Sequence, residues 1–346
     1  MLEKKVLLGI LMGIVTVGVS AAQNVPDHVT VAGGLTSIPL LLKAGEQFVS
    51  KAPQYKPPQA LYNNTATGFK LFCASTAGET PNINTATRDI QPAEFESCNK
   101  NGVTEIVRFK LGHDALVAAQ TPGSRFSELA RKDIFLAVAK DIPDPKDNGK
   151  LIPNPYKTWK DINPALPDAK IQVLGPDPAL GLYQTYLSAI ILSGCREVSY
   201  FKGLEANNPK DFESACKNFR KDGFYSEYPR FTDAVADLKQ APDALSLLPL
   251  TVSLRENLKV LTLDKMQPTL VNVAQNKYAL TFPLMVFIKK SHINLIPGFK
   301  EYLAELTSDD AIGTAGYLYN LGVIPLPLAE RKQQRADVEA LKLMTK

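Results

Sequence analysis

The sequence predicts an α/β protein arranged as two lobes of one domain or as two compact domains. Its 346 residues are too many for one small core. Short β-like runs alternate along the chain with helix-like stretches, as they do in α/β proteins. The 25 prolines are scattered, which favours many short connections over long helical bundles or coiled coils.

Glycine and proline mark the ends of the predicted elements in the N-terminal third. Gly33-Gly34 ends the first strand, and Gly102 stops the second helix. Pro39 suits the first turn of the helix that follows Gly33-Gly34, because its missing N–H costs nothing there. These elements are a strand at 28–32, helices at 40–48 and 93–101, and a strand at 105–111 that continues through 115–119.

The middle and the end of the chain continue the alternation. Residues 127–139 have helical spacing and carry Ser127 as the expected cap. The proline-rich stretch 142–167 predicts a surface connection around the single tryptophan, Trp159. The remaining elements are a strand at 170–174, a helix at 181–193, a strand at 279–289, a helix at 297–306 and a charged helix at 329–346 with little to bury.

Composition limits the classes of partner. Hydrophobic residues make up 45% of the chain and charged residues 21%, which excludes wholesale disorder. The formal net charge is only +4, so we predict no nucleic-acid partner.

Residues 1–22 have the three parts of a secretory signal peptide. Lys4 and Lys5 are followed by an apolar run from Val6 to Val19 and then by the small residues Ser20-Ala21-Ala22. The run of about 14 residues is shorter than the roughly 20 of a spanning helix, which makes a retained anchor the weaker alternative. We expect a soluble chain exported to the periplasm.

Four cysteines agree with an oxidising compartment, where they would form disulfides. Three connectivities are open to Cys73, Cys98, Cys195 and Cys216. Local pairing, Cys73 with Cys98 and Cys195 with Cys216, closes two loops that would each contribute roughly 3 kcal/mol. No metal site is predicted, because zinc spacing and histidine partners are both lacking.

No motif predicts an enzyme or a cofactor. The histidines are His28, His113 and His292, and His113 before Asp114 is the best general-base candidate. A loop histidine satisfied by Asp114 is the favoured explanation for it. The sequence has no nucleophile elbow, Walker loop, zincin motif or dinucleotide fingerprint.

Several fragments in collinear order carry a family resemblance. They are Val31-Ala-Gly-Gly-Leu-Thr-Ser-Ile-Pro39, Thr67-Gly-Phe-Lys-Leu-Phe-Cys73, Ala86-Thr-Arg-Asp-Ile90, Glu96-Ser-Cys-Asn-Lys-Asn-Gly-Val103, Trp159-Lys-Asp-Ile-Asn-Pro164, Gly175-Pro176, Pro297-Gly-Phe-Lys-Glu-Tyr-Leu303, Gly316-Tyr-Leu318 and Gly322-Val-Ile-Pro-Leu-Pro327. With them, the chain resembles the phosphate-binding protein of bacterial phosphate ABC transporters over nearly its whole mature length. Both cysteine pairs fall where a cysteine-containing branch of that family has them.

The resemblance implies a type II periplasmic binding protein. Its two lobes would each be a mixed sheet flanked by helices, joined by crossing strands. Lobe 1 would comprise 23–112 plus 268–346, and lobe 2 would comprise 113–267. The protein would be a monomer that binds a small-molecule solute in the cleft between the lobes and meets an inner-membrane ABC permease or receptor. Ligands of such folds meet strand ends and helix N-termini.

The predicted ligand loops depart from the family. Where a typical member has Thr-Ser-Gly-Thr-Arg-Asp, this chain has Ala179-Leu-Gly-Leu-Tyr-Gln184, without the hydroxyls, the arginine and the aspartate. A Gly-Glu-Asn-Asp-like segment is replaced by Pro229-Arg-Phe-Thr232, and a late arginine by Phe282. The loss is on the order of 5 kcal/mol of phosphate binding. An apolar and aromatic cleft for an organic solute is therefore predicted, with one polar or anionic group facing Arg88.

The resemblance assigns ligand roles to Thr36, Ser37, Thr67, Thr87, Arg88, Leu180, Leu182, Tyr183, Gln184 and Phe282. Other roles stay open for them: Leu180 and Leu182 would pack in the core or seal the cleft, Arg88 would form an ion pair, Tyr183 would lie at the rim, and Thr36 and Thr87 would cap helices. Two alternative functions also stay open. One is a ligand-free structural or regulatory paralogue, and the other is retained phosphate binding through Arg88, Thr36, Thr67 and backbone N–H groups.

Overall fold

The computed structural model describes residues 26–346 except residues 35, 145, 276 and 346. The predicted signal peptide lies outside these residues. One nine-stranded sheet runs through the molecule in the order β2-β1-β3-β13-β4-β10-β8-β9, with β11 paired to β4. Two small two-stranded sheets, β12-β5 and β6-β7, lie beside it. The fold is a mixed α/β fold.

The strands are β1 (Thr30–Gly33), β2 (Gln59–Tyr62), β3 (Ile83–Ala86), β4 (Ile106–Gln120), β5 (Glu128–Leu129), β6 (Asp141–Asp144), β7 (Asp147–Pro153), β8 (Val173–Pro176), β9 (Tyr225–Tyr228), β10 (Leu245–Pro249), β11 (Lys259–Val260), β12 (Thr262–Leu263) and β13 (Thr281–Lys289). The α-helices are α1 (Ile38–Lys51), α2 (Thr65–Phe72), α3 (Pro92–Lys100), α4 (Arg131–Val138), α5 (Trp159–Ile162), α6 (Tyr183–Thr185), α7 (Ser193–Arg196), α8 (Ser199–Asn207), α9 (Pro209–Cys216), α10 (Phe231–Gln240), α11 (Leu250–Arg255), α12 (Leu270–Ala274), α13 (Phe299–Leu306), α14 (Asp309–Ile312) and α15 (Leu328–Glu339). A π-helical segment η1 (Tyr186–Leu192) joins α6 to α7, and η2 (Lys290–His292) and η3 (Tyr319–Leu321) are short 3₁₀ turns.

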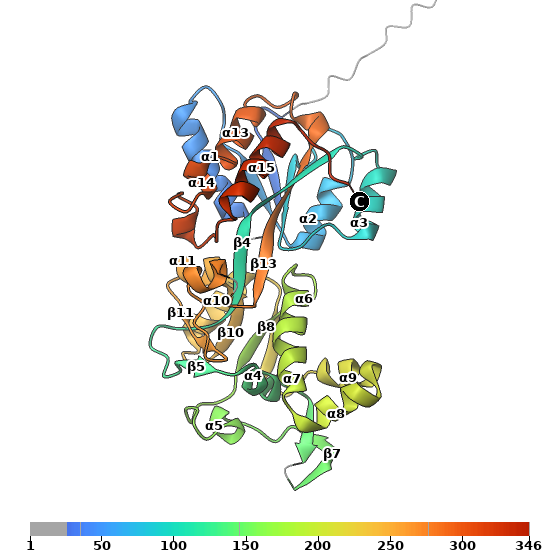
Figure 1. Ribbon diagram of the computed structural model, residues 1–346, viewed down its shortest axis with the longest axis vertical. Helices are drawn as coiled ribbons and strands as arrows, with labels where there is room; N and C mark the ends of the chain where they lie inside the picture. The colour runs from blue at the N-terminus through green and yellow to red at the C-terminus, as the bar shows by residue number, and fades with distance from the viewer. Residues whose placement is uncertain (1–25, 35, 145, 276, 346) are drawn as a thin grey trace, which may run out of the picture.

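The long strand β4 changes partners along its length. Its first part, through Ala115, pairs antiparallel with β13, and Leu116–Ala119 pair antiparallel with β10. In Figure 1, β4 and β13 run between two groups of elements, with α1, α2, α3, α13, α14 and α15 around one end and α4 to α11 around the other. We call the first group, with β1, β2 and β3, the β1 side, and the second, with β8, β9 and β10, the β8 side.

Several predicted elements are confirmed. β1, α1, α3, β4 and β13 lie where the sequence predicts them; Pro39 lies in the first turn of α1 and Gly102 follows α3 with a φ of +81°. The positive φ explains why the helix stops at a glycine. The local disulfide pairing is also confirmed, since Cys73 bonds Cys98 and Cys195 bonds Cys216.

Two of the local predictions are wrong. Ser127 caps no helix: α4 begins at Arg131, because Glu128–Leu129 pair with Thr262–Leu263 of β12. The stretch around Trp159 is not merely a surface connection, since that indole is fully buried against Phe126 and the stretch holds the β6-β7 hairpin and α5.

The charged C-terminal helix buries little, as predicted, but it ends at Glu339 and not at 346. Val338 and Arg331 of α15 are buried, and the Arg331 guanidinium donates to the Leu326 carbonyl at 2.7 Å and pairs with Asp309. Within the described residues, no helix is long and apolar enough to cross a membrane, and no group of three or more His, Cys, Asp or Glu residues could hold a metal ion.

Candidate ligand cleft

A small cavity lies where the β1 side meets the β8 side. On the β1 side, the parallel strands β1, β2 and β3 place their carboxyl ends at one edge of the sheet, beside the first turns of α1 and α2. On the β8 side, the segments that follow the parallel strands β8 and β9 face this edge. Crevices beyond the carboxyl ends of strands are the usual ligand sites of α/β sheets.

Hydroxyl groups dominate the β1-side wall of this cavity. The described lining residues on that wall are Gly34, Thr36, Ser37, Asn64, Thr65, Thr85, Ala86 and Thr87, and those opposite are Leu180, Gly181 and Phe231. The lining side chains carry no ionisable group. The cavity measures about 20 Å³, which is room for roughly one water molecule.

Two helix N-termini belong to the β1-side wall. Ser37 is the residue before α1, a helix of 14 residues, and Thr65 is the first residue of α2, a helix of 8 residues. The Asn64 side chain caps α2 by accepting the Thr67 N–H at 2.8 Å. The helix dipole at such ends favours an anion. At the start of α1 the N–H groups of Ser37 and Ile38 already donate to the Gly34 carbonyl, at 3.2 and 3.1 Å, so this end contributes its dipole and not free N–H donors.

Two hydroxyls in the wall lack hydrogen-bond partners. Ser37 is 2% exposed and Thr87 is 8% exposed, and neither Ser37 Oγ nor Thr87 Oγ1 has a partner among the described residues. A buried polar group without a partner costs free energy on the order of 1–3 kcal/mol. Both residues line the cavity, where a bound molecule could supply the missing hydrogen bonds.

Gly181 closes the cavity from the β8 side. A Cβ atom added to Gly181 would lie 2.5 Å from Thr65 Oγ1 and closer still to Thr87 Oγ1, whereas real Cβ atoms essentially never come within 3.0 Å of a neighbour. Only glycine permits this approach. The structure therefore shows the cleft in a closed arrangement, with Leu180 and Phe231 buried beside Gly181.

A larger groove adjoins the cavity. It measures about 340 Å³, a usual size for a ligand site, and shares Gly34, Asn64, Leu180 and Phe231 with the cavity. Its other lining residues are Tyr62, Asn63, Pro229 and Arg230. The cleft thus combines a small polar cavity with an apolar and aromatic groove.

Thr36, Ser37, Thr87 and Leu180 are the sequence-predicted ligand residues that line the cavity. The others lie elsewhere. Thr67 and Gln184 are exposed, Leu182 is buried in the core, Tyr183 packs near Tyr186 with ring centroids 6.2 Å apart, and Phe282 is buried on β13. Of the residues predicted to make the cleft apolar, Leu180 lines the cavity and the groove, whereas Leu182, Tyr183 and Phe282 line neither.

Arg88 lines neither the cavity nor the groove. Its Nη1 and Nη2 atoms each donate to a carboxylate oxygen of Glu94 at 2.8 Å, and its guanidinium lies 5.6 Å from the Phe69 ring centre. Glu94 also accepts the Gln91 N–H at the start of α3. In this arrangement Arg88 forms the ion pair that the sequence left open as its other role. A ligand role for Arg88 stays a prediction that the geometry does not favour.

The sequence-based choice missed Thr65, Gly181, Phe231 and Tyr62. Thr65 had a usable signal, because Asn64 is a typical N-cap and places the hydroxyl of the next residue at the helix start. Gly181, Phe231 and Tyr62 carry no local signal of this kind. Their roles depend on which segments the fold brings together.

The histidines do not form a catalytic site. His113 lies within β4 and not in a loop, and its backbone N–H donates to the Ile324 carbonyl at 2.9 Å. The expected partnership with Asp114 is wrong, because that carboxylate accepts hydrogen bonds from Thr251 and Ala115. Buried His292 contacts the Asn82 side chain and the Thr76 carbonyl.

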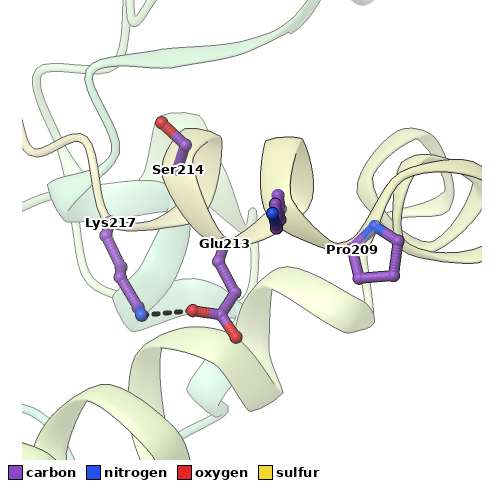
Figure 2. Close-up of a pocket in the computed structure, with 5 residues that line it drawn as sticks. Pro209, Glu213, Ser214 and Lys217 are labelled. Atoms are coloured by element: carbon purple, nitrogen blue, oxygen red, sulfur yellow. Dashed lines mark hydrogen bonds and ion pairs between the residues drawn. The ribbon is translucent and has the colours of Figure 1, made fainter.

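A further hollow of about 380 Å³ lies on the surface of α9 (Figure 2). Pro209, Lys210, Glu213, Ser214 and Lys217 line it, and Lys217 Nζ donates to Glu213 at 2.6 Å. All five residues lie in or directly after one exposed helix. The hollow holds no buried polar group and indicates no ligand.

Residues 18–310 match the family model described as a PBP superfamily domain. The chain belongs to the PBP superfamily. Its relatives include the phosphate-binding protein PstS of Staphylococcus saprophyticus, 21% identical over 310 residues that cover 89% of this chain and 83% of the relative. PstS of Staphylococcus epidermidis is 25% identical over 292 residues, covering 83% and 77%.

Solved structures show the same fold as this PBP superfamily member. The phosphate binding protein of Stenotrophomonas maltophilia aligns with a TM-score of 0.62 at 11% identity, over 89% of this chain and 93% of that one. A putative phosphate ABC transporter substrate-binding protein with bound phosphate, from Clostridium perfringens, aligns with a TM-score of 0.58 at 14% identity, over 87% and 100%. The sequence-based family assignment is confirmed: the chain is a distant homologue of PstS, in a family of binding proteins that are not enzymes.

Proposed function

We propose that this protein is a periplasmic solute-binding protein whose ligand is an organic oxyanion. Its acidic head would bind the hydroxyl-lined wall of the small cavity, which must widen from the arrangement described here to admit it, and its organic part would lie in the groove. The observation that carries the proposal is the pair of unpartnered buried hydroxyls, Ser37 and Thr87, beside two helix N-termini. Such a set of neutral donors suits the oxygen atoms of an anion.

The opposite wall supports an organic ligand over free phosphate. Leu180, Gly181 and Phe231 offer no side-chain hydrogen-bond donor, so an anion surrounded by oxygens would lose its water on that side without compensation. An organic substituent has no such need. The adjoining groove, with Tyr62 and Phe231 among its lining residues, provides apolar surface for it.

We propose that the ligand is enclosed by two lobes that close around β4 and β13. The change of partner on β4 between Ala115 and Leu116 supports a boundary near the predicted one at 112/113. The lobes would correspond to the β1 side and the β8 side. Since closure around a ligand alters the outer surface, an ABC permease or receptor in the inner membrane would recognise the closed form.

Inorganic phosphate is the second candidate ligand. The hydroxyls of Thr36, Ser37 and Thr87 favour it, because they are polar contacts that a small oxyanion can use without any organic part. A cleft that stays closed and takes no ligand would instead indicate the structural or regulatory paralogue.

Calorimetric titration of the mature protein with ethylphosphonate and with inorganic phosphate tests the proposal. We expect ethylphosphonate to bind more tightly than phosphate. Ser37→Ala and Thr87→Val are each expected to weaken ethylphosphonate binding about tenfold, the effect of one lost hydrogen bond to an anion.

The matched control is Ser214→Ala, which removes an exposed hydroxyl from α9 and should leave binding unchanged. Tighter binding of phosphate than of the phosphonate would favour the second candidate. Binding of neither would contradict both and favour the ligand-free paralogue.

A further inference from the structure

The groove carries one cation, and it lies apart from the polar cavity. Among the described residues that line the cavity or the groove, Arg230 alone has a positively charged side chain. It is the residue before α10, and Phe231, which lines both the groove and the cavity, follows it directly. A ligand that extends from the cavity past Phe231 therefore approaches the Arg230 guanidinium.

The Arg230 side chain is available to a ligand. It is 72% exposed, and its Nε and Nη2 atoms donate to Asp233 at 3.0 and 2.9 Å, while Nη1 has no partner among the described residues. Exposed ion pairs three residues apart on a helix contribute little to stability. An acid group of a ligand can thus bind at Nη1 without breaking the pair, or take the place of Asp233.

The cavity and the adjoining groove differ in chemistry. Neutral hydroxyls and helix N-termini line the cavity, whereas apolar and aromatic side chains (Leu180, Phe231, Tyr62) and the single positive charge of Arg230 line the groove. An anion joined by an apolar spacer to a second anion would match these two parts. A guanidinium recognises carboxylate and phosphate groups through hydrogen bonds assisted by charge.

We infer that Arg230 forms a second acid-binding subsite and that the ligand is a two-headed acid. Its oxyanion head would occupy the cavity and a second acidic group would bind Arg230, with a short carbon chain between them. The inference rests on the proposed function, because it takes the head group in the cavity as given.

A series of phosphono-carboxylates with one to three methylene groups, compared with alkylphosphonates of equal chain length, tests this inference by calorimetry. One length of the phosphono-carboxylate is expected to bind about tenfold more tightly than its alkyl counterpart, the gain from one hydrogen bond to a charged group. Arg230→Gln is expected to abolish that advantage.

The control variant is Arg335→Gln, which removes the same charge from an exposed pair with Glu339 on α15. It separates a local effect of Arg230 from the change in net charge, and the advantage should survive it. Melting temperatures of both variants show whether the fold is kept.

The outcomes distinguish the two levels of the proposal. Equal binding of the two series, or an advantage that survives Arg230→Gln, overturns the second subsite while the proposed function stands. Failure of every phosphonate to bind overturns the proposed function, and the inference with it.

Discussion

Replacing Gly181 with alanine is expected to prevent closure of the cleft and to weaken ethylphosphonate binding by more than about a hundredfold. The added Cβ would lie 2.5 Å from Thr65 Oγ1 and closer to Thr87 Oγ1, so the two sides must move apart. Separation removes the contacts of Leu180 and Phe231 with the ligand, and affinity falls with the population of the closed form. Calorimetry measures the affinity, and small-angle X-ray scattering with the ligand at saturating concentration measures the shape.

The scattering is expected to show a larger radius of gyration for Gly181→Ala than for the unaltered protein. Gly203→Ala is the matched control, because a Cβ at Gly203, on α8, meets no atom within 4 Å. Both variants should melt near the temperature of the unaltered protein, since the affected contact lies at the cleft surface and not in a core. Unchanged affinity in Gly181→Ala would show that ligand binding does not need the closed arrangement seen here.

Local patterns predicted the elements whose ends are marked by the chain itself. Pro39 and the apolar spacing after it identified α1, and Gly102 identified the end of α3. The prediction that Ser127 caps a helix was wrong because the helical spacing of residues 127–139 includes Glu128–Leu129. These two residues instead pair with β12, more than 130 residues later in the chain. Pairing over such a distance leaves no periodic signal in the strand itself.

The two walls of the cleft also differ in how far local sequence patterns predict them. Thr36, Ser37 and Thr87 were predictable, because hydroxyls after strand ends and at helix starts have a local reason to be there. Leu180 was predicted as a ligand residue because it lies in the segment that replaces the family motif. The role of Gly181 beside it depends on its close approach to Thr65 and Thr87, which only the folded structure shows. For Arg88 the sequence left an ion pair and a ligand contact open, and it could not name Glu94, six residues away, as the partner that the structure pairs with it.

The carboxylate of Asp114 is expected to make the stability of the protein depend on pH. Asp114 is fully buried on β4, next to Ala115, the last residue there to pair with β13. Its carboxylate accepts the Thr251 N–H at 3.2 Å, the Thr251 hydroxyl and the Ala115 N–H at 2.7 Å. Burial outweighs these hydrogen bonds and raises the pKa of Asp114 from 3.8 to about 6.

The sign of the effect follows from the direction of this shift. The folded protein holds the proton more tightly than the unfolded chain, so the stabilising contribution of protonated Asp114 is fully present below about pH 4 and is lost as the pH rises through 6. A rise of about two pKa units corresponds to roughly 3 kcal/mol. Asp114→Asn keeps an oxygen acceptor and does not titrate, so its free energy of unfolding should lack this decline.

Urea unfolding of the unaltered protein and of Asp114→Asn at intervals from pH 4 to pH 7.5 measures the difference directly. Other carboxylates, such as Glu227, whose pKa is also raised by burial, titrate equally in both proteins and cancel in the comparison. The free energy of unfolding of the unaltered protein should fall relative to that of the variant by roughly 3 kcal/mol over this range. Parallel curves would show that the hydrogen bonds from Thr251 and Ala115 compensate for the burial of the charge, so that folding leaves the pKa of Asp114 near that of the unfolded chain.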